Sequence, residues 1–219
     1  MRTAKTVLTV IQERGKQKKP IERVYKLLFN RELYLNAYAK LYPNNGAMTK
    51  GVTDETVDGM SIQKIDRMIE ILREEKYQWK PARREYIKKK NGKKRPLGIP
   101  VWGDKVLQEV MRQILEAYYE PQFSEHSHGF RPNRGCHTAL QEIQVWKGTR
   151  WFIEGDISQY FDTIDHKILL EILARNIHDG RFIRLVSNML EAGYLEEWKF
   201  NQTISGVPQG GVILSLIHI

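Results

Sequence analysis

The chain has 219 residues, 41% of them hydrophobic, which is enough for one large folded domain or two small ones and excludes a disordered tail. No apolar run approaches the roughly 18 residues of a spanning helix, and the N-terminus lacks a secretory pattern, so we expect no membrane partner. The net charge is +9, and the single cysteine, Cys136, excludes an internal disulfide and fits the reducing cytoplasm.

The first third of the chain predicts helices. Residues 1–20 are polar and basic, and we expect a short helix at most, followed by a flexible basic arm. Apolar residues recur at steps of three and four over 21–42, which predicts one helix or two helices that break near Asn30. A loop rich in Gly, Thr and Asp then leads to Ser61, which predicts the N-cap of a helix with an apolar stripe over 62–72.

Residues 76–95 carry the excess positive charge, and the remainder of the chain is neutral overall. Such a concentrated patch indicates a polyanionic partner: nucleic acid, a nucleotide or an anionic membrane. Tyr77, Trp79 and Tyr86 lie among these basic residues, and aromatic rings among cations favour nucleic acid because bases stack on them. The alternatives are a solvated basic loop and, without a basic amphipathic helix to support it, a membrane surface.

The same region predicts a β-hairpin. Residues 84–90 and 93–99 form its strands, and Asn91-Gly92 is a strong two-residue turn. Strands this charged must present one face to solvent or to a ligand. The basic residues that we expect to face nucleic acid are Lys80, Arg83, Arg84, Lys88, Lys90, Lys93 and Lys94.

The second half predicts alternating helices and short strands. Apolar periodicity predicts helices over 103–119, 138–146, 165–176 and 181–191, and residues 194–204 could form a second hairpin.

A short apolar strand over 151–156 is predicted to end in Asp156. A carboxylate at the end of a buried strand can hold a metal ion or simply cap a turn, and the strand alone does not decide between them. The basic hairpin favours the metal, because phosphoryl transfer needs cations around the phosphates and carboxylates that fix metal ions. The glycine-rich turn at 205–211 allows close backbone approach to a ligand, and its Gln209 can donate and accept hydrogen bonds.

Five stretches resemble, in the same order, blocks of the reverse transcriptases encoded by group II introns. They are NNGAMTKGVTDETVDGM, WKPARREYIKKKNGKKRPLGIP, HGFRPNRGCHTAL, FIEGDISQYFDTIDH and SGVPQGGV. The resemblance implies an α+β fold with the fingers and an incomplete palm of a right-hand polymerase. The divisions that it implies are a basic arm (1–20), a helical N-terminal extension (21–82), fingers (83–149), a partial palm (150–212) and an atypical end (213–219).

The resemblance implies a metal site at Asp156. This residue would be the first catalytic aspartate and would bind Mg²⁺ together with the backbone carbonyl of Ile157. Asp162 and Asp165 are expected to be structural, one pairing locally and the other capping a helix.

It also implies contacts to nucleotide and template. Lys89 and Arg95, on opposing strands of the hairpin, would contact the triphosphate of the incoming dNTP. Phe161 would lie beneath its sugar and exclude a 2′-hydroxyl, and Gln209 would touch the nucleotide. Arg131 would meet the template or the backbone of the fingers.

The chain departs from the family pattern in two places. Lys88 stands where the family often has Pro, and residues 213–219 do not continue the usual Ser-Pro-Leu-Leu. The sequence contains no Tyr-x-Asp-Asp block, so we expect this polypeptide alone not to polymerise, since one carboxylate hardly organises two metals. The expected partners are group II intron RNA, an RNA template and a DNA primer, in the bacterial cytoplasm or nucleoid. The alternative is an RNA-binding module without catalysis, and an unfinished sheet makes a homodimer plausible.

Overall fold

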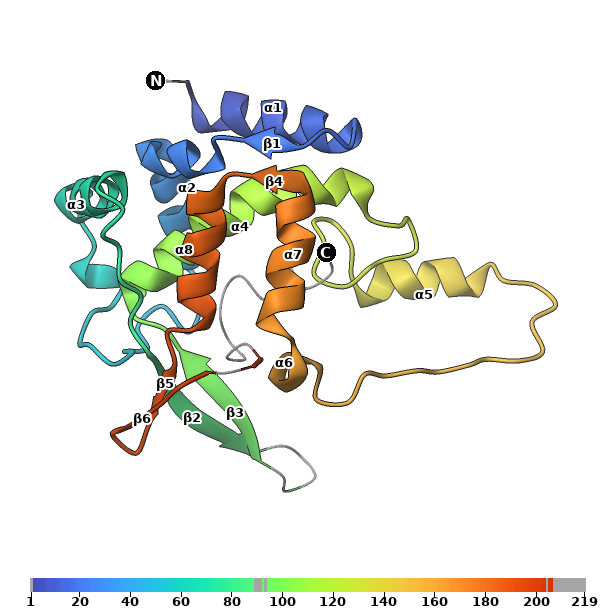
Figure 1. The fold of residues 1–219 in the computed structure, drawn as a ribbon. Helices are drawn as coiled ribbons and strands as arrows, with labels where there is room; N and C mark the ends of the chain where they lie inside the picture. The colour runs from blue at the N-terminus through green and yellow to red at the C-terminus, as the bar shows by residue number, and fades with distance from the viewer. Residues whose placement is uncertain (1, 89–91, 93, 204, 207–219) are drawn as a thin grey trace.

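The computed structural model describes residues 2–88, 92, 94–203 and 205–206, which form a mixed α+β fold (Figure 1). In chain order the helices and strands are α1 (Ala4–Lys16), β1 (Ile21–Glu22), the 3-10 helix η1 (Val24–Phe29), α2 (Arg31–Leu41), η2 (Val57–Gly59), α3 (Ile62–Arg73), β2 (Ala82–Lys88), β3 (Lys94–Ile99), α4 (Trp102–Tyr119), η3 (Glu120–Gln122), α5 (Cys136–Gln144), α6 (Tyr160–Thr163), α7 (His166–Asn176), β4 (Ile177–His178), α8 (Gly180–Leu190), β5 (Tyr194–Glu196) and β6 (Lys199–Asn201). None of the described helices is long and apolar enough to cross a membrane.

Helix α4 forms the centre of the helical core. Val106, Val110 and Ile114, at steps of four along one face, are completely buried, and both α1 and α2 pack against this helix. The expectation of a short helix and a flexible arm over residues 1–20 is therefore wrong. Helix α1 has 13 residues, and its Ala4 and Ile11 are buried in the core, because apolar residues spaced by seven lie on one face of a helix.

Local capping signals set the boundaries of several helices, as the sequence predicts. The Ser61 hydroxyl accepts a hydrogen bond from the Lys64 N–H at 3.2 Å, and Asn30 separates η1 from α2 by capping the latter. Asp165 caps α7 through the N–H groups of Lys167 and Ile168, so its predicted structural role is confirmed.

Two sheets join distant parts of the chain. The larger has the strand order β3-β2-β5-β6, with β2 antiparallel to β3 and parallel to β5. Both predicted hairpins are present, and Lys88 lies opposite Lys94 at the end of the first one. The smaller sheet pairs β1 with β4, and beside it the Asp179 carboxylate accepts the Tyr25 N–H at 2.9 Å.

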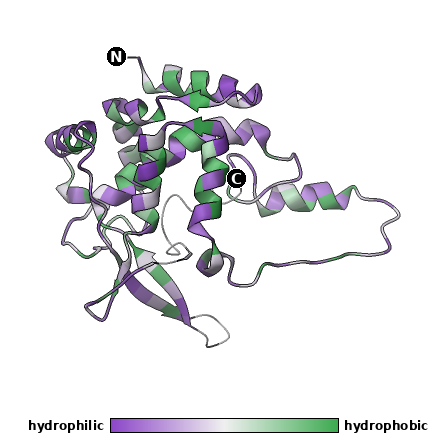
Figure 2. Cartoon of the chain, viewed as in Figure 1, coloured by the Kyte–Doolittle hydropathy of each residue, from purple (hydrophilic) through white to green (hydrophobic). Residues whose placement is uncertain are grey.

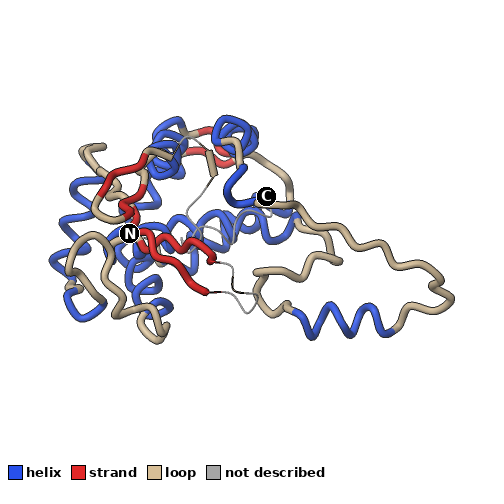
Figure 3. The backbone as a smooth tube through the Cα atoms, turned by 90° about the horizontal axis from the view of Figure 1, so that it is seen from below, coloured by secondary structure: helices blue, strands red, loops and turns tan. Residues whose placement is uncertain are grey.

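The strand predicted over 151–156 is not formed. These residues belong to a long connection that leaves the body of the molecule together with α5 (Figures 1 and 3), and Trp151 and Ile153 are 87% and 94% exposed. A strand needs a neighbour for its backbone hydrogen bonds, and neither sheet of the described chain pairs with this segment. The predicted strand is therefore wrong, because the apolar composition of this run contains no information about a neighbouring strand.

Candidate functional site

The end of the first hairpin presents exposed lysines. Lys88 and Lys94 occupy directly opposite positions, and neither forms an ion pair within the described part of the chain. Like charges opposite each other on two strands repel, so this pair weakens the hairpin. A polyanion bound there would remove that repulsion. In Figure 2 these strands carry hydrophilic stretches beside hydrophobic ones, and the exposed Lys80 lies two residues before β2.

The predicted RNA-facing arginines of β2 are engaged within the protein. The Arg83 guanidinium donates to the Lys50 carbonyl at 3.1 and 2.9 Å and pairs with Glu85. The Arg84 guanidinium carbon lies 3.3 Å from the centre of the Tyr194 ring, and its nitrogen is 3.9 Å from a Glu196 oxygen. These contacts hold β2 to its neighbours. They disfavour the expectation that both arginines face RNA, which stays a prediction.

Two of the three aromatic residues of the basic segment do not form a stacking platform. The half-buried Tyr77 donates its hydroxyl to Asp104 at 2.6 Å, and Trp79 donates its ring N–H to the Leu185 carbonyl at 3.0 Å. Their rings meet edge to face, 5.2 Å apart, against the hydrophobic core. Only Tyr86 is exposed, and its hydroxyl donates to Glu196. The interpretation that bases stack on Tyr77 and Trp79 is therefore wrong. Both rings pack their apolar surface against the core, and their polar atoms form hydrogen bonds within the protein.

Asp156 and Ile157 lie in the long exposed connection before α6. A side-chain carboxylate and the following backbone carbonyl are oxygen donors of the kind that Mg²⁺ takes. Within the described residues, however, no three His, Cys, Asp or Glu side chains gather closely enough to hold a metal ion. These two residues therefore do not form a metal centre with the described part of the chain alone.

The turn that carries Phe161 contacts the start of the glycine-rich segment. The Gly206 N–H donates to the Ile164 carbonyl at 2.8 Å, and the Ser205 hydroxyl is 3.4 Å from the Asp162 carbonyl. A Cβ atom on Gly206 would lie 2.7 Å from the Phe161 carbonyl oxygen, so only glycine allows this approach. The structure thus brings together two stretches that the sequence separates by some 40 positions.

Arg131 is held inside the loop that precedes α5. Its side chain is 7% exposed, and its guanidinium donates to both Glu120 carboxylate oxygens and to the carbonyls of Ser124 and Ser127. These bonds occupy its donors within the protein. Contact with a template stays a prediction, and the described geometry gives Arg131 a structural role.

The remaining predicted residues divide into two groups. Arg95 lies on β3 opposite Ile87 and is exposed. The other four predicted contacts, Lys89, Lys90, Lys93 and Gln209, lie outside the described residues.

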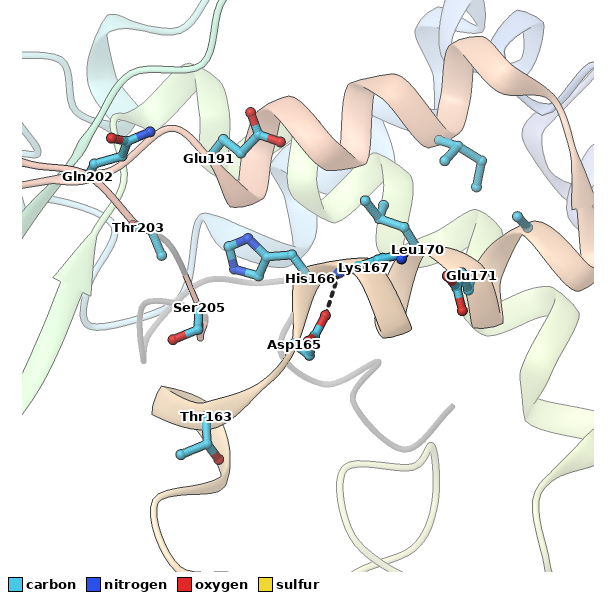
Figure 4. A pocket seen from close by; sticks show the side chains of 12 residues that line it. Thr163, Asp165, His166, Lys167, Leu170, Glu171, Glu191, Gln202, Thr203 and Ser205 are labelled. Atoms are coloured by element: carbon cyan, nitrogen blue, oxygen red, sulfur yellow. Dashed lines mark hydrogen bonds between the residues drawn. The ribbon is translucent and has the colours of Figure 1, made fainter.

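A cavity of about 730 Å³ lies between the start of α7, the end of α8 and the segment after β6 (Figure 4). His166 extends into it toward Thr203 and Ser205, and its Nε2 atom is 2.6 Å from the Gly206 carbonyl oxygen. Sequence reasoning missed His166 as a site residue. Its position directly after the capping Asp165 is the signal that marks it, because a residue there projects beside the first turn of the helix.

A second cavity, of about 540 Å³, is lined by the start of α4 and includes Asp104. This carboxylate accepts hydrogen bonds from the Tyr77 hydroxyl and, at 3.0 Å, from the Lys80 N–H. Burial raises the pKa of Asp104 to about 6, although both hydrogen bonds and the Lys80 charge act in the opposite direction. Sequence reasoning missed this residue too, since nothing local predicts that a carboxylate in the first turn of a helix is buried.

Comparison with known proteins gives a consistent result. The family model described as "Reverse transcriptase (RNA-dependent DNA polymerase)" matches residues 87–217. The chain is 49% identical over 197 residues to the group II intron-encoded protein LtrA of Lactococcus lactis subsp. cremoris, a match covering 89% of this chain and 33% of the relative. It is 45% identical over 222 residues to an uncharacterized 91 kDa protein in the cob intron of Schizosaccharomyces pombe, covering 98% of this chain and 28% of the relative. A shorter match, 36% over 93 residues, is to nuclear intron maturase 1 of Arabidopsis thaliana, covering 42% of this chain and 13% of the relative. The chain thus spans about a third or less of these relatives.

Proposed function

Because this chain belongs to the reverse transcriptase family, we propose that it is the N-terminal part of an RNA-directed DNA polymerase encoded by a group II intron. In this proposal the protein binds intron RNA and supports splicing and target-primed reverse transcription, with an RNA template, a DNA primer and dNTPs as further partners. The observation that carries it is the family match over 87–217, which includes β3, α4 and the Phe161 turn. The exposed thiol of Cys136 supports a reducing location, the cytoplasm or nucleoid.

The fold supports an assignment in which the first hairpin belongs to the fingers, and residues 150–212 belong to the palm, of a right-hand polymerase. Lys88 and Lys94 would contact RNA phosphates, whereas Phe161 and Gln209 would face the nucleotide. Asp156, with the Ile157 carbonyl, would supply part of the ligand set for Mg²⁺. When bound, such an ion stabilises the charge that develops on the transferred phosphoryl group. The described residues do not complete that set, so further carboxylates would have to come from elsewhere in the enzyme.

Filter binding to structured group II intron RNA over a series of salt concentrations tests the RNA contact. The double variant Lys88→Ala/Lys94→Ala should reduce the magnitude of the slope of log affinity against log salt by about 1.4 to 1.8, because two phosphate contacts are lost. The control Lys5→Ala/Lys26→Ala removes the same charge from exposed positions of α1 and η1. An equal loss in both variants would show a general charge effect and contradict a hairpin site.

Primer extension on an RNA template with Mg²⁺ and dNTPs tests the catalytic state of the 219-residue polypeptide. We expect no cDNA, since the sequence lacks the Tyr-x-Asp-Asp block and no three His, Cys, Asp or Glu side chains of the described residues cluster closely enough to hold a metal ion. Robust cDNA synthesis by the purified polypeptide would show that the chain, by itself or as an oligomer, assembles a metal site.

The second candidate function is an RNA-binding module without catalysis. It is favoured by the exposed position of Asp156, because within the described part of the chain no three His, Cys, Asp or Glu side chains cluster closely enough to hold a metal ion. If binding is the retained function, Asp156→Ala should leave the affinity for intron RNA unchanged in the same filter assay. In a longer polypeptide that does synthesise cDNA, the same substitution should abolish synthesis, which separates the two functions.

A further inference from the structure

The four-stranded sheet lies at the edge of the molecule, away from α1, and the pairing of its strands assigns each side chain to one of two faces (Figure 1). Successive residues of a strand point to opposite faces, and residues directly opposite on neighbouring strands point to the same face. One face, called the Tyr86 face from here on, carries the polar and aromatic side chains of Arg84, Tyr86, Lys88, Lys94, Glu196 and Lys199.

The Tyr86 face is basic. Among its paired residues the only carboxylate is Glu196, against four cationic side chains. Lys88, Lys94 and Lys199 are exposed, and none of the three forms an ion pair within the described part of the chain. A face with this balance of charge attracts phosphate groups.

Tyr86 places an aromatic ring among these cations. The residue is 46% exposed, and its hydroxyl donates to Glu196. The Glu196 carboxylate lies 3.9 Å from Arg84, whose guanidinium lies over the Tyr194 ring. These contacts hold the Tyr86 ring before any ligand binds, which lowers the entropic cost of binding. A base can stack on such a ring whatever its sequence, because every base has a π face.

The opposite face of the same sheet differs in composition. It carries Ile87, which is paired with Arg95, and the exposed Phe200, which is paired with Leu195. In the proposed function Arg95 contacts the triphosphate, so the incoming nucleotide lies on that side. An RNA on the Tyr86 face is therefore separated from the nucleotide by the sheet itself.

We propose that the Tyr86 face binds an unpaired segment of the intron RNA, with a base stacked on Tyr86 and phosphates at the surrounding lysines. The diagonal from Lys94 to Lys199 crosses three strand spacings and about four residues, roughly 20 Å, the length of about six stacked nucleotides. A duplex hides the faces of its bases, so an exposed ring selects single-stranded RNA. This inference rests on the proposed function for the identity of the RNA.

Fluorescence anisotropy of the 219-residue polypeptide with two labelled probes, a short unstructured RNA and an RNA duplex of the same composition, tests the stacking. Tyr86→Leu should weaken binding of the single strand roughly tenfold and that of the duplex by less than about twofold, because one stacked base is lost. Tyr86→Phe keeps the ring and should bind within about twofold of the wild type. Phe200→Leu is the matched control, since it removes an exposed ring from the opposite face of the same sheet and should leave both affinities unchanged.

Lys199→Ala tests the extent of the surface at an exposed position that does not involve Tyr86. It should reduce the magnitude of the salt slope for the single strand by about 0.7, because one phosphate contact is lost. Equal effects of Tyr86→Leu and Phe200→Leu, equal losses for single strand and duplex, or an unchanged slope in Lys199→Ala would overturn the inference.

Binding of group II intron RNA separates this inference from the proposed function. If intron RNA binds tightly and Tyr86→Leu changes neither its affinity nor that of the short RNA, the proposed function stands and the Tyr86 face is not the site. If Tyr86→Leu weakens the short RNA but the polypeptide does not prefer intron RNA to an unrelated structured RNA, the Tyr86 face binds single strands and the proposed function is wrong.

Discussion

Asp104 shows how a single buried carboxylate makes the fold sensitive to pH. Its carboxylate lies at the start of α4, where it accepts hydrogen bonds from the Tyr77 hydroxyl and the Lys80 N–H. Burial disfavours the charged form more strongly than these donors favour it, and the pKa rises to about 6. Below the ordinary pKa of 3.8, Asp104 is protonated in both the folded and the unfolded chain. Between these values the folded protein retains a proton that the unfolded chain has released.

The free energy of unfolding should therefore fall as pH rises from about 4 to 6, by up to about 3 kcal/mol from this residue. Asp104→Asn has no carboxyl to titrate, so its stability relative to the wild type should increase across the same interval and stay constant above it. Urea denaturation of both proteins at several pH values measures the difference. Parallel pH profiles would show that Asp104 titrates normally in the folded state.

Gly206 and Gly92 form a matched pair for testing the contact at the Phe161 turn. Both have a φ of +78°, so alanine is strained by a similar amount at either position. A Cβ atom at Gly92 meets nothing within 4 Å, whereas one at Gly206 would press on the backbone of Phe161 and Asp162. Gly206→Ala should lower the free energy of unfolding by about 1 to 3 kcal/mol more than Gly92→Ala. Equal losses of the free energy of unfolding in urea titrations would mean that the Phe161 turn moves to accommodate the Cβ atom without loss of stability.

At the scale of elements, the loop between η3 and α5 depends on Arg131. Lysine at this position keeps the charge but cannot reproduce the fork that bonds Glu120 and two carbonyls. Arg131→Lys should lower the free energy of unfolding by about 1 to 3 kcal/mol and leave the RNA affinity of the folded protein unchanged. Denaturation and filter binding measure the two effects.

Arg134→Lys is the control, because Arg134 lies in the same loop and bonds only one carbonyl, that of Glu125, among the described residues. It should be much less destabilising than Arg131→Lys. Lower RNA affinity in Arg131→Lys with unchanged stability would instead support the template contact that the resemblance implies.

The elements that the sequence predicts well are those with local signals. Ser61 and Asp165 cap their helices where expected, and the first hairpin forms where expected, although its register pairs Lys88 with Lys94 and not with Arg95, as a two-residue turn at 91–92 would require. The strand over 151–156 depends on a neighbouring strand, and its composition carries no information about that neighbour. The burial of α1 depends likewise on α4, which lies more than 80 positions away in sequence.

The residues of the candidate site also fall into two groups: those that local sequence signals place, and those whose contacts depend on the tertiary fold. Lysines at a hairpin end can be placed from sequence, because their exposure follows from their charge. The partners of Arg84 and Arg131 could not be predicted from sequence, since Tyr194 and Glu120 come close to them only in the tertiary fold. The contact of His166 with Gly206 is of the same kind, joining residues 40 positions apart.

On the scale of the whole molecule, the segment from α5 to α6 exposes an unusual amount of apolar surface. The exposed side chains are Leu140, Ile143, Val145, Trp146, Trp151, Phe152, Ile153 and Ile157. Exposed apolar side chains favour association, and the homodimer predicted from sequence is consistent with this exposure.

Light scattering should show self-association of the 219-residue polypeptide at micromolar concentration. Trp151→Ser/Ile153→Ser should shift it toward the monomer, because the two most exposed apolar side chains of the segment are removed. Trp198→Ser is the control, since Trp198 is 93% exposed but sits at the turn between β5 and β6. A monomer at all concentrations, or an equal effect of the control, would exclude this segment as the interface.

The two sheets also dictate an order of assembly during translation. The Tyr25 N–H meets Asp179 across 154 positions, and Trp79 bonds Leu185 across 106, so these contacts wait until most of the chain has been synthesised. Helices α1, α2 and α4, in contrast, are complete well before the ribosome reaches β4. The nascent chain therefore completes helices α1, α2 and α4 first and holds β2 without its parallel neighbour β5 while about a hundred further residues are added, which takes about 5 to 20 s at roughly 5 to 20 residues per second.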